Sequence, residues 1–309
     1  MKNMHVGIAA GITKAASKQT YYTIRFLADH DRVADAYRAY AYFRWVDDVL
    51  DGAANSRGER SDFIQRQKSL LVRCHRNESI RDANTQEQML VELVEGDSEK
   101  DSGLQSYVRN MMEVMSFDAE RRGREISQNE LTDYTRWLAT AVTEAVHHCI
   151  GHGCSSPRDA SRYLAVSGAH IAHMLRDTFD DIQAGYYNIP QEILSANRIR
   201  VQDVESDAYR AWVRSRVQLA RWYFRFGKKY FCEIGNLRCR LAGFAYIARF
   251  EWLLDTFEEE GYCLRPKYDE RRSLGTALRM SLDTLTAMLH LRGAGTIPKA
   301  VSIRTRSAR

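Results

Sequence analysis

Two short aspartate clusters, far apart in the chain, carry the residues best suited to chemistry. Asp47, Asp48 and Asp51 lie in the run YRAYAYFRWVDDVLD, and Asp177 and Asp181 lie in the run HMLRDTFDDIQAGYYNIP. In a helix, residues four positions apart project from one face, so each cluster can present two carboxylates to one cation. Magnesium held by carboxylates keeps several waters and takes further ligands from substrate phosphates. The two clusters therefore predict a pair of metal clamps that grip a diphosphate.

A basic side chain accompanies each cluster. A single motif of this kind is usually a helix cap or a solvated charge, but both motifs here lie in apolar, aromatic runs where uncompensated carboxylates are costly. Arg44 precedes the first cluster and Arg176 directly precedes Asp177, and either guanidinium can also hold phosphate oxygens. The four acids expected to be catalytic and to bind metal are Asp47, Asp51, Asp177 and Asp181, with Asp48 as a further metal ligand.

The composition indicates a largely helical globular enzyme. Of the 309 residues, 44% are hydrophobic, which is enough for a large core, while only 4 are proline and 18 glycine. Stretches rich in Ala, Leu, Arg, Glu and Gln favour helix, so we expect one all-α domain over residues 1–309. The six cysteines are scattered and no secretory signal is recognisable, which predicts reduced thiols and a cytoplasmic location.

Hydropathy and charge limit the classes of partner that we expect for this protein. No run approaches the length of an apolar membrane span, so any membrane contact is expected to be peripheral. The formal net charge is +5, and part of the excess lies in the run KAVSIRTRSAR, where a flexible basic tail is expected from about residue 294. The arginine-rich runs RRGR and ARWYFRFGKK match no nucleic-acid-reading motif, so no nucleic-acid partner is expected.

Helical periodicity runs through nearly the whole chain. Residues 18–51 carry apolar groups at three- and four-residue spacing, which predicts two helices broken near His30 and Asp31. Gly, Asn and Ser indicate loops at 52–61 and 94–104. Further helices are expected at about 62–75, 86–95, 104–118, 128–152, 158–183, 206–234, 239–260 and 272–292.

Several segments resemble those of a known family. The run YAYFRWVDDVLD is similar to the first aspartate motif of the squalene/phytoene synthase family, and LRDTFDDIQAGYYNIPQEIL is similar to the second. Thr20-Tyr21-Tyr22 stands where the family has a Ser-Phe pair, SFDAERRGREISQNELTDYTRWLATAV resembles the middle segment, and GFAYIARFEWLLDTFEEEGYCLR resembles the late helix. The likeness covers most of the chain, and two motifs at the right separation are a specific signal.

The resemblance implies an all-α isoprenoid-synthase fold, a helical bundle around a central active-site cavity. It implies that two or three Mg²⁺ ions help to ionise a C15 or C20 prenyl diphosphate, and that the allylic cation joins a second prenyl diphosphate head to head. NADPH would be needed only for a squalene-type reaction. An apolar wall must keep water from the cation, and the expected lining residues are Tyr40, Phe43, Trp45, Tyr134, Trp137 and Phe179. The expected substrate-binding residues are Arg44, Arg176, Tyr22, Tyr40, Tyr134, His170, Arg265 and Lys267.

The chain departs from the family pattern around the second motif. His173 and His170 stand where the family usually carries Asn and Gln. Four-residue steps align His173 with both acids of this motif, so it is a candidate metal ligand, general base or diphosphate partner; an ordinary satisfied polar residue is the alternative. The stretch Ala184-Gly185-Tyr186 replaces an Arg-Gly-Arg stretch, which removes two phosphate-facing cations.

Other positions also depart from the pattern. Thr140 and Thr143 stand where the family has glycines, which would narrow a channel passing there. Gln19 replaces a lysine of the first helix unless the alignment slips by one residue. Phe250 takes the position of a phosphate-binding tyrosine. The candidates for the basic partner at that position are Arg265, Lys267 and Arg271.

Three functions remain open on this evidence. The first is head-to-head condensation to squalene-like or phytoene-like C30 or C40 hydrocarbons. The second is a terpene synthase or prenyl diphosphatase acting on one substrate, which His170, His173 and the narrowed helix favour. The third is a non-catalytic assembly factor, against which the retained acids argue. A monomer and a homodimer are both compatible with the sequence.

A separate cluster, made of His147, His148, Cys149, His152 and Cys154, invites a zinc interpretation. Its spacing matches no common structural zinc pattern. A helix end followed by a glycine-flanked turn accounts for it better.

Overall fold

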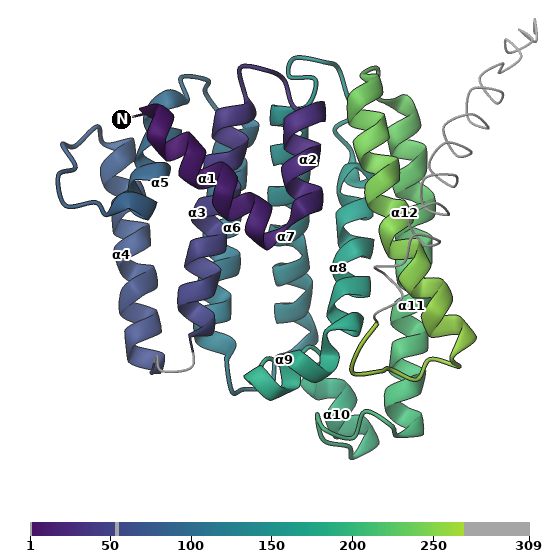
Figure 1. Ribbon diagram of the computed structural model, residues 1–309. Coiled ribbons are helices and arrows are strands. Elements are labelled where there is room, and N and C mark those ends of the chain that lie inside the picture. The colour runs from purple at the N-terminus through teal and green to yellow at the C-terminus, as the bar shows by residue number, and fades with distance from the viewer. Residues whose placement is uncertain (1, 53–55, 269–309) are drawn as a thin grey trace, which may run out of the picture.

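The computed structural model describes residues 2–52 and 56–268, and within these ranges it contains twelve α-helices, one short 3-10 helix and no strand (Figure 1). The all-α prediction is therefore confirmed. The helix expected at 272–292 and the basic tail lie outside the described residues. The α-helices are α1 (Lys2–Ala16), α2 (Lys18–Leu27), α3 (Val33–Asp51), α4 (Arg57–His75), α5 (Thr85–Gly96), α6 (Gly103–Arg121), α7 (Gln128–Cys149), α8 (Leu164–Arg176), α9 (Thr178–Ala184), α10 (Gln191–Asn197), α11 (Asp207–Glu233) and α12 (Leu237–Glu259).

Local capping explains one difference from the sequence-based boundaries. α4 begins at Arg57, inside the segment predicted to be a loop. The Ser56 hydroxyl accepts from the backbone N–H of Glu59 at 3.2 Å, and the Glu59 carboxylate accepts from the Ser56 N–H at 2.6 Å. This reciprocal capping box satisfies backbone donors that a helix start leaves free, so the helix begins earlier than composition suggested. α1 and α10 also lie where no helix was predicted.

The prediction of a single helix over 158–183 is wrong. This segment is divided into a 3-10 turn (Ala160–Tyr163), α8 and α9, and Asp177 lies at the α8–α9 junction with φ −92° and ψ 7°. The Thr178 hydroxyl lies 3.1 Å from the Met174 carbonyl oxygen and 3.0 Å from that of Leu175, a contact that bends helices. His173 and the two acids of the second motif therefore do not share one straight helix.

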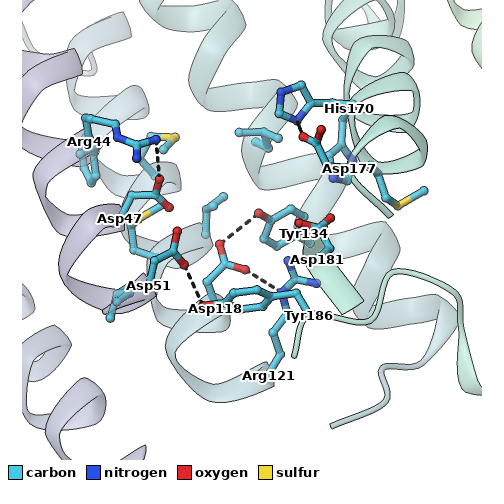
Figure 2. A pocket seen from close by; sticks show the side chains of 18 of the residues that line it. Arg44, Asp47, Asp51, Asp118, Arg121, Tyr134, His170, Asp177, Asp181 and Tyr186 are labelled. Atoms are coloured by element: carbon cyan, nitrogen blue, oxygen red, sulfur yellow. Dashed lines mark hydrogen bonds and ion pairs between the residues drawn. The ribbon is translucent and has the colours of Figure 1, made fainter. Parts of the chain in front are cut away.

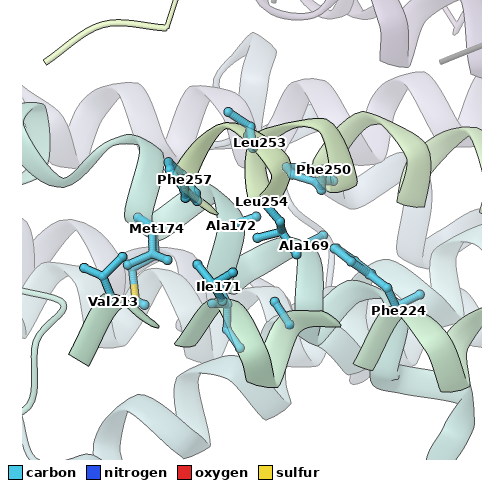
Figure 3. Packing of buried hydrophobic residues seen from close by; sticks show 14 of the residues in the cluster. Ala169, Ile171, Ala172, Met174, Val213, Phe224, Phe250, Leu253, Leu254 and Phe257 are labelled. Atoms are coloured by element: carbon cyan, nitrogen blue, oxygen red, sulfur yellow. The ribbon is translucent and has the colours of Figure 1, made fainter. Parts of the chain in front are cut away.

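Two hydrophobic cores flank α7. One core gathers buried residues of α1 to α6, with Tyr42 fully buried, and the other gathers those of α8, α11 and α12, with Phe224 fully buried. In Figure 3, labelled side chains of these last three helices pack together. Tyr134 and Trp137 of α7 pack against both cores. α7 therefore separates the helix that carries the first aspartate cluster from the helix that leads to the second.

The direction of the helices brings the two clusters to the same end of the bundle. In Figure 1, the C-terminal end of α3 and the junction of α8 with α9 both lie at the lower end. None of the described helices has the length and apolar character needed to cross a bilayer.

Candidate active site

A cavity of about 540 Å³ lies between α3, α6, α7 and α8, and both aspartate clusters line it (Figure 2). Asp47 and Asp51 come from the last turns of α3, while Asp177 and Asp181 come from the α8–α9 junction and from α9. Asp51 is exposed, whereas Phe43 of the same lining is buried. Asp51 thus faces solvent, Asp47, Asp177 and Asp181 are partly buried, and the cavity also has apolar wall residues.

The other predicted site residues divide into two groups. Arg44, Tyr40, Tyr134, His170 and His173 line the cavity. Outside the lining are Asp48, Tyr22, Arg176, Arg265 and Lys267. Asp48 is exposed and bonded to Arg44, Tyr22 lies on α2 with 47% of its surface exposed, and Arg265 is paired with Glu260 at 3.0 Å.

The apolar wall also differs from the sequence-based expectation. Tyr40, Phe43 and Tyr134 line the cavity as expected, but Trp45 instead packs edge-on against Phe63 at 5.4 Å between ring centroids. Trp137 and Phe179 pack against the cores, and Thr143 is buried outside the lining. The remaining apolar and aromatic lining residues are Leu50, Tyr107, Met111, Val114, Met115, Leu138, Met174 and Tyr186.

Sequence reasoning missed a buried acid at the centre of the site. Asp118 of α6 accepts from the Arg121 Nε at 2.6 Å and from the Tyr134 hydroxyl at 3.1 Å, and all three residues line the cavity. In Figure 2, Asp118 lies between the two aspartate clusters. The signal that could have revealed it is an acid three residues before an arginine inside an otherwise apolar helix.

Hydrogen bonds connect this pair to the second cluster through Asn188, and a contact of Arg121 with the ring of Tyr186 connects it to the first. Arg121 donates to Asn188 at 2.8 Å, and the Asn188 amide donates to Asp181 at 2.7 Å. On the other side, the Tyr186 hydroxyl donates to Asp51 at 3.2 Å. The carboxylates are thus held in a connected polar network and not as independent surface charges.

Two arginines from another part of the chain lie beside the Ala184-Gly185-Tyr186 stretch. The guanidinium of Arg121 lies 5.0 Å from the centre of the Tyr186 ring, and that of Arg122 lies 5.9 Å from it. Arg122 also donates to the Ala184 carbonyl at 2.9 Å. Two positive charges from the end of α6 therefore stand beside the tyrosine, at distances typical of cation–π contact.

The charge balance of the cavity favours a hard cation. Burial, followed by the charge of Asp51, raises the pKa of Asp47 to about 7, and burial with Asp177 raises the pKa of Asp181 to about 7. Burial also raises the pKa of Asp118. Asp51 additionally ends α3, where the helix dipole disfavours negative charge. A divalent ion relieves this repulsion, and carboxylate oxygens are the ligands that Mg²⁺ prefers, so these residues fit magnesium.

Arginines hold Asp177 from outside the lining. Arg176 donates two hydrogen bonds of 2.5 Å to this carboxylate and lies 2.7 Å from the His173 Nε2. Burial, and to a lesser extent the positive charge of nearby Arg176, lowers the pKa of Arg249 of α12. Arg249 also donates a hydrogen bond to Gln19 of α2 at 2.6 Å. The late helix thus contributes Arg249 as the basic residue near the second motif, where sequence reasoning favoured later residues; Arg271 lies outside the described range.

The histidine and cysteine cluster lies at the opposite end of α7. His147 is 2.7 Å from the Tyr230 hydroxyl. In the described part of the chain, Glu99, His148 and His152 form the one group of three potential ligands whose ligand atoms lie within 4.8 Å of one another. The Arg32 guanidinium donates to the His148 Nε2 at 3.1 Å. A positive charge at this ring opposes a metal ion there, which agrees with the interpretation of a capped helix end.

Comparison with solved structures defines the class of protein. A squalene synthase, HpnC, from Alicyclobacillus acidocaldarius superposes with a TM-score of 0.68 at 16% sequence identity, covering 85% of this chain and 97% of that one. A dehydrosqualene synthase in complex with a ligand superposes with a TM-score of 0.70 at 14% identity, covering 94% and 98%. The helical bundle therefore has the isoprenoid-synthase fold that the sequence predicted.

The family follows from the sequence. The model of the family described as squalene/phytoene synthase matches residues 13–276. The chain belongs to the squalene/phytoene synthase family, and the resemblance seen in its aspartate motifs is confirmed. Family and fold support a prenyltransferase-type enzyme that condenses prenyl diphosphates. No curated protein gives a significant match to this sequence.

Proposed function

We propose that this protein catalyses the magnesium-dependent, head-to-head condensation of two C15 or C20 prenyl diphosphates with release of diphosphate. The observation that carries the proposal is that Asp47, Asp51, Asp177 and Asp181 line one cavity with an apolar inner wall. A diphosphate ester of a long hydrocarbon matches this cavity, because its charged head suits the acids with bound metal and its apolar tail suits the inner wall. A cytoplasmic location, peripheral membrane contact and the choice between monomer and homodimer stay predictions.

The acids and arginines would act on the head of the substrate. Mg²⁺ held by the four aspartates would neutralise the charge that grows on diphosphate as the C–O bond breaks. Arg44 lines the cavity and lies 3.2 Å from Asp47, so its remaining N–H groups can donate to phosphate oxygens. Arg121 is fixed by Asp118 and Asn188, which keeps a second positive charge among the acids.

The inner wall would act on the tail and on the cation. Phe43, Met111 and Met115 can bury hydrocarbon and exclude water, which would otherwise capture the allylic cation. The rings of Tyr40 and Tyr134 can face positive charge without reacting with it. The alternative function, in which one substrate ionises and then cyclises or is hydrolysed, would use the same clamp. The presence of His170 and His173 in the lining supports that alternative.

Measuring the release of inorganic diphosphate tests whether the four aspartates act as a metal clamp. Purified protein with Mg²⁺ and a C15 or C20 diphosphate should release inorganic diphosphate, and Asp47→Ala or Asp177→Ala should lower the rate by about 100-fold or more with helicity unchanged. Asp180→Ala is the matched control, because Asp180 belongs to the second cluster but is exposed and lies outside the lining; its rate should stay within about threefold of the wild type. Full activity in either clamp variant would refute the proposal.

Product mass separates the two functions. C30 or C40 hydrocarbons support head-to-head condensation, whereas C15 or C20 terpenes or alcohols support the reaction of one substrate.

A further inference from the structure

His170 occupies a position between two cavities. It lines the cavity that holds the aspartates and also a second cavity of about 260 Å³ bounded by α7, α8 and α11. Its ring lies 5.2 Å from the ring of Tyr134, another residue of the active-site wall. This histidine is therefore in reach of a molecule in the active-site cavity, yet no step of the proposed ionisation uses it.

The hydrogen bonds around His170 favour a proton on one of its two ring nitrogens. The hydroxyl of Thr135 lies 2.8 Å from the Leu131 carbonyl, so its one hydrogen is donated there. The same oxygen lies 3.0 Å from the His170 Nδ1, and this arrangement favours a proton on Nδ1 that is donated to the hydroxyl. In a neutral imidazole the other nitrogen, Nε2, carries a lone pair. Nε2 makes no hydrogen bond to any residue in the described part of the chain.

The surroundings keep this imidazole neutral. Burial, together with the charges of His173 and Arg121, lowers the pKa of His170 to about 3. A weak base is sufficient in this cavity, because a proton on the carbon next to a carbocation is far more acidic than an imidazolium. Nε2 is thus an uncharged proton acceptor at a wall that otherwise offers mainly apolar and aromatic groups to a hydrocarbon.

We propose that His170 is the base that takes the proton from the last carbocation, so that the reaction ends in a new C=C bond and needs no reductant. The inference rests on the proposed condensation of prenyl diphosphates. The C–H bond next to the cationic carbon breaks, its electron pair becomes the second bond of the alkene, and the proton binds Nε2. Joining two allylic diphosphates in this way releases two diphosphates and two protons. The imidazolium then returns its proton to water or to released diphosphate.

Thr135 would be a positioning residue in this scheme. By accepting from Nδ1–H, it turns Nε2 away from α7 and excludes the tautomer in which Nε2 is protonated. Thr135→Val removes the hydroxyl that accepts from Nδ1–H and nearly preserves the shape of the side chain. Thr256→Val on α12 is the matched control, because the Thr256 hydroxyl donates to the Trp252 carbonyl at 3.1 Å in the same way but bonds to no histidine among the described residues.

The test measures two quantities in parallel for the purified full chain with Mg²⁺ and C15 or C20 diphosphate: diphosphate release and product mass, with and without NADPH. The wild type should give a reductant-free alkene whose mass NADPH does not change. His170→Phe keeps an aromatic wall without a base, and His170→Gln keeps a partner for Thr135. Both should lose about tenfold or more of the terminal alkene formed per diphosphate released, which is the lower end of the effect of a general base. The lost product should reappear as alcohols or earlier intermediates.

The possible failures are distinguishable. If the wild type releases no diphosphate, the proposed function fails and the role of His170 fails with it. If diphosphate release is intact and the His170 variants make the wild-type fraction of alkene, only the role of His170 is overturned. A wild-type product that becomes two mass units heavier with NADPH would also overturn it.

The tautomer can be observed without substrate. In ¹⁵N-histidine-labelled protein, the His170 signal, assigned by its absence in His170→Phe, should show a protonated Nδ1 and an unprotonated Nε2 at pH 7. Thr135→Val should change this pattern and lower the alkene fraction, while Thr256→Val should change neither. An Nε2–H tautomer in the wild type would contradict the proposal.

Discussion

The hydroxyl of Tyr186 donates a hydrogen bond to Asp51 across 3.2 Å, which joins the turn after the second aspartate cluster to the end of the first. Arg121 at the end of α6 and Arg122 just after it lie against the ring of the same tyrosine. Burial raises the pKa of Tyr186 above its usual value, so the phenol keeps its proton and remains a donor. One side chain therefore connects both acid clusters with two cations.

Variants of Tyr186 should distinguish the contribution of its hydroxyl to activity from that of its ring. Tyr186→Phe removes one hydrogen bond, worth about 0.5–1.5 kcal/mol, and should lower kcat/KM for diphosphate release by about 2- to 10-fold. Tyr186→Ala also removes the surface against which Arg121 and Arg122 pack, and should cost at least a further threefold, roughly the value of an exposed cation–π contact. Steady-state kinetics at saturating Mg²⁺ would check this order, and equal losses in both variants would contradict a role for the ring.

Asp118 and Arg121 should behave as a coupled buried pair. Both side chains are nearly buried and their Oδ1 and Nε atoms are 2.6 Å apart. Arg121→Met leaves an acid without its partner and should destabilise the fold by about 3–5 kcal/mol, as removal of one member of a buried pair does. The double variant Asp118→Leu with Arg121→Met should cost less than the sum of the single changes. Urea denaturation of the four proteins would measure the coupling, and additive losses would exclude it.

The metal-free protein should lose stability as the pH rises. The pKa values of Asp47 and Asp181, about 7, are above the ordinary carboxyl value, so the folded state binds more protons than the unfolded chain between about pH 4 and pH 7. Stability therefore falls through that window. In EDTA, Asp47→Asn should raise the Tm at pH 8 by a few degrees and have little effect near pH 4.

The same thermal denaturation experiment tests whether these carboxylates bind Mg²⁺. Adding Mg²⁺ at pH 8 should raise the Tm of the wild type, because the ion relieves the repulsion, and should raise that of Asp47→Asn less. Asp180→Asn is the control, since Asp180 is exposed and outside the cavity lining, and it should keep the wild-type response to both pH and Mg²⁺. A lower Tm for metal-free Asp47→Asn at pH 8 would show that this carboxylate is compensated by the protein alone.

Adding one methyl group where α8 packs on α11 should destabilise the protein. A Cβ at Gly227 would lie 3.0 Å from the backbone nitrogen of Ala165 and 2.9 Å from its Cβ. Gly227→Ala should therefore cost about 1–3 kcal/mol and displace the helix that carries His170. Gly11→Ala is the matched control, because nothing lies within 4 Å of the added atom in α1; it should stabilise by about 0.5–1 kcal/mol. Thermal denaturation would compare the two, and an unchanged Tm for Gly227→Ala would show that the helices can separate freely.

Helix content and the acid clusters were accessible from sequence because both are encoded locally. Apolar groups at three- and four-residue spacing predicted most helices, and carboxylates inside apolar runs indicated a charge that something must neutralise. The break at Asp177 was not accessible, because the sequence around Thr178 is equally compatible with a continuous helix. The hydroxyl contacts that bend the chain there appear only once the helices are packed.

The sequence by itself determined the fold class, the family and the four acids that line the cavity. Tertiary structure decided that Asp118, Arg121, Tyr186 and Asn188 complete the polar site, that Arg249 is the late-helix cation, and that Trp45 and Arg265 lie elsewhere. The physical reason is that periodicity and the cost of buried charge act along one helix, whereas partners between helices depend on how those helices pack. That packing brings together residues whose separation along the chain carries no local signal.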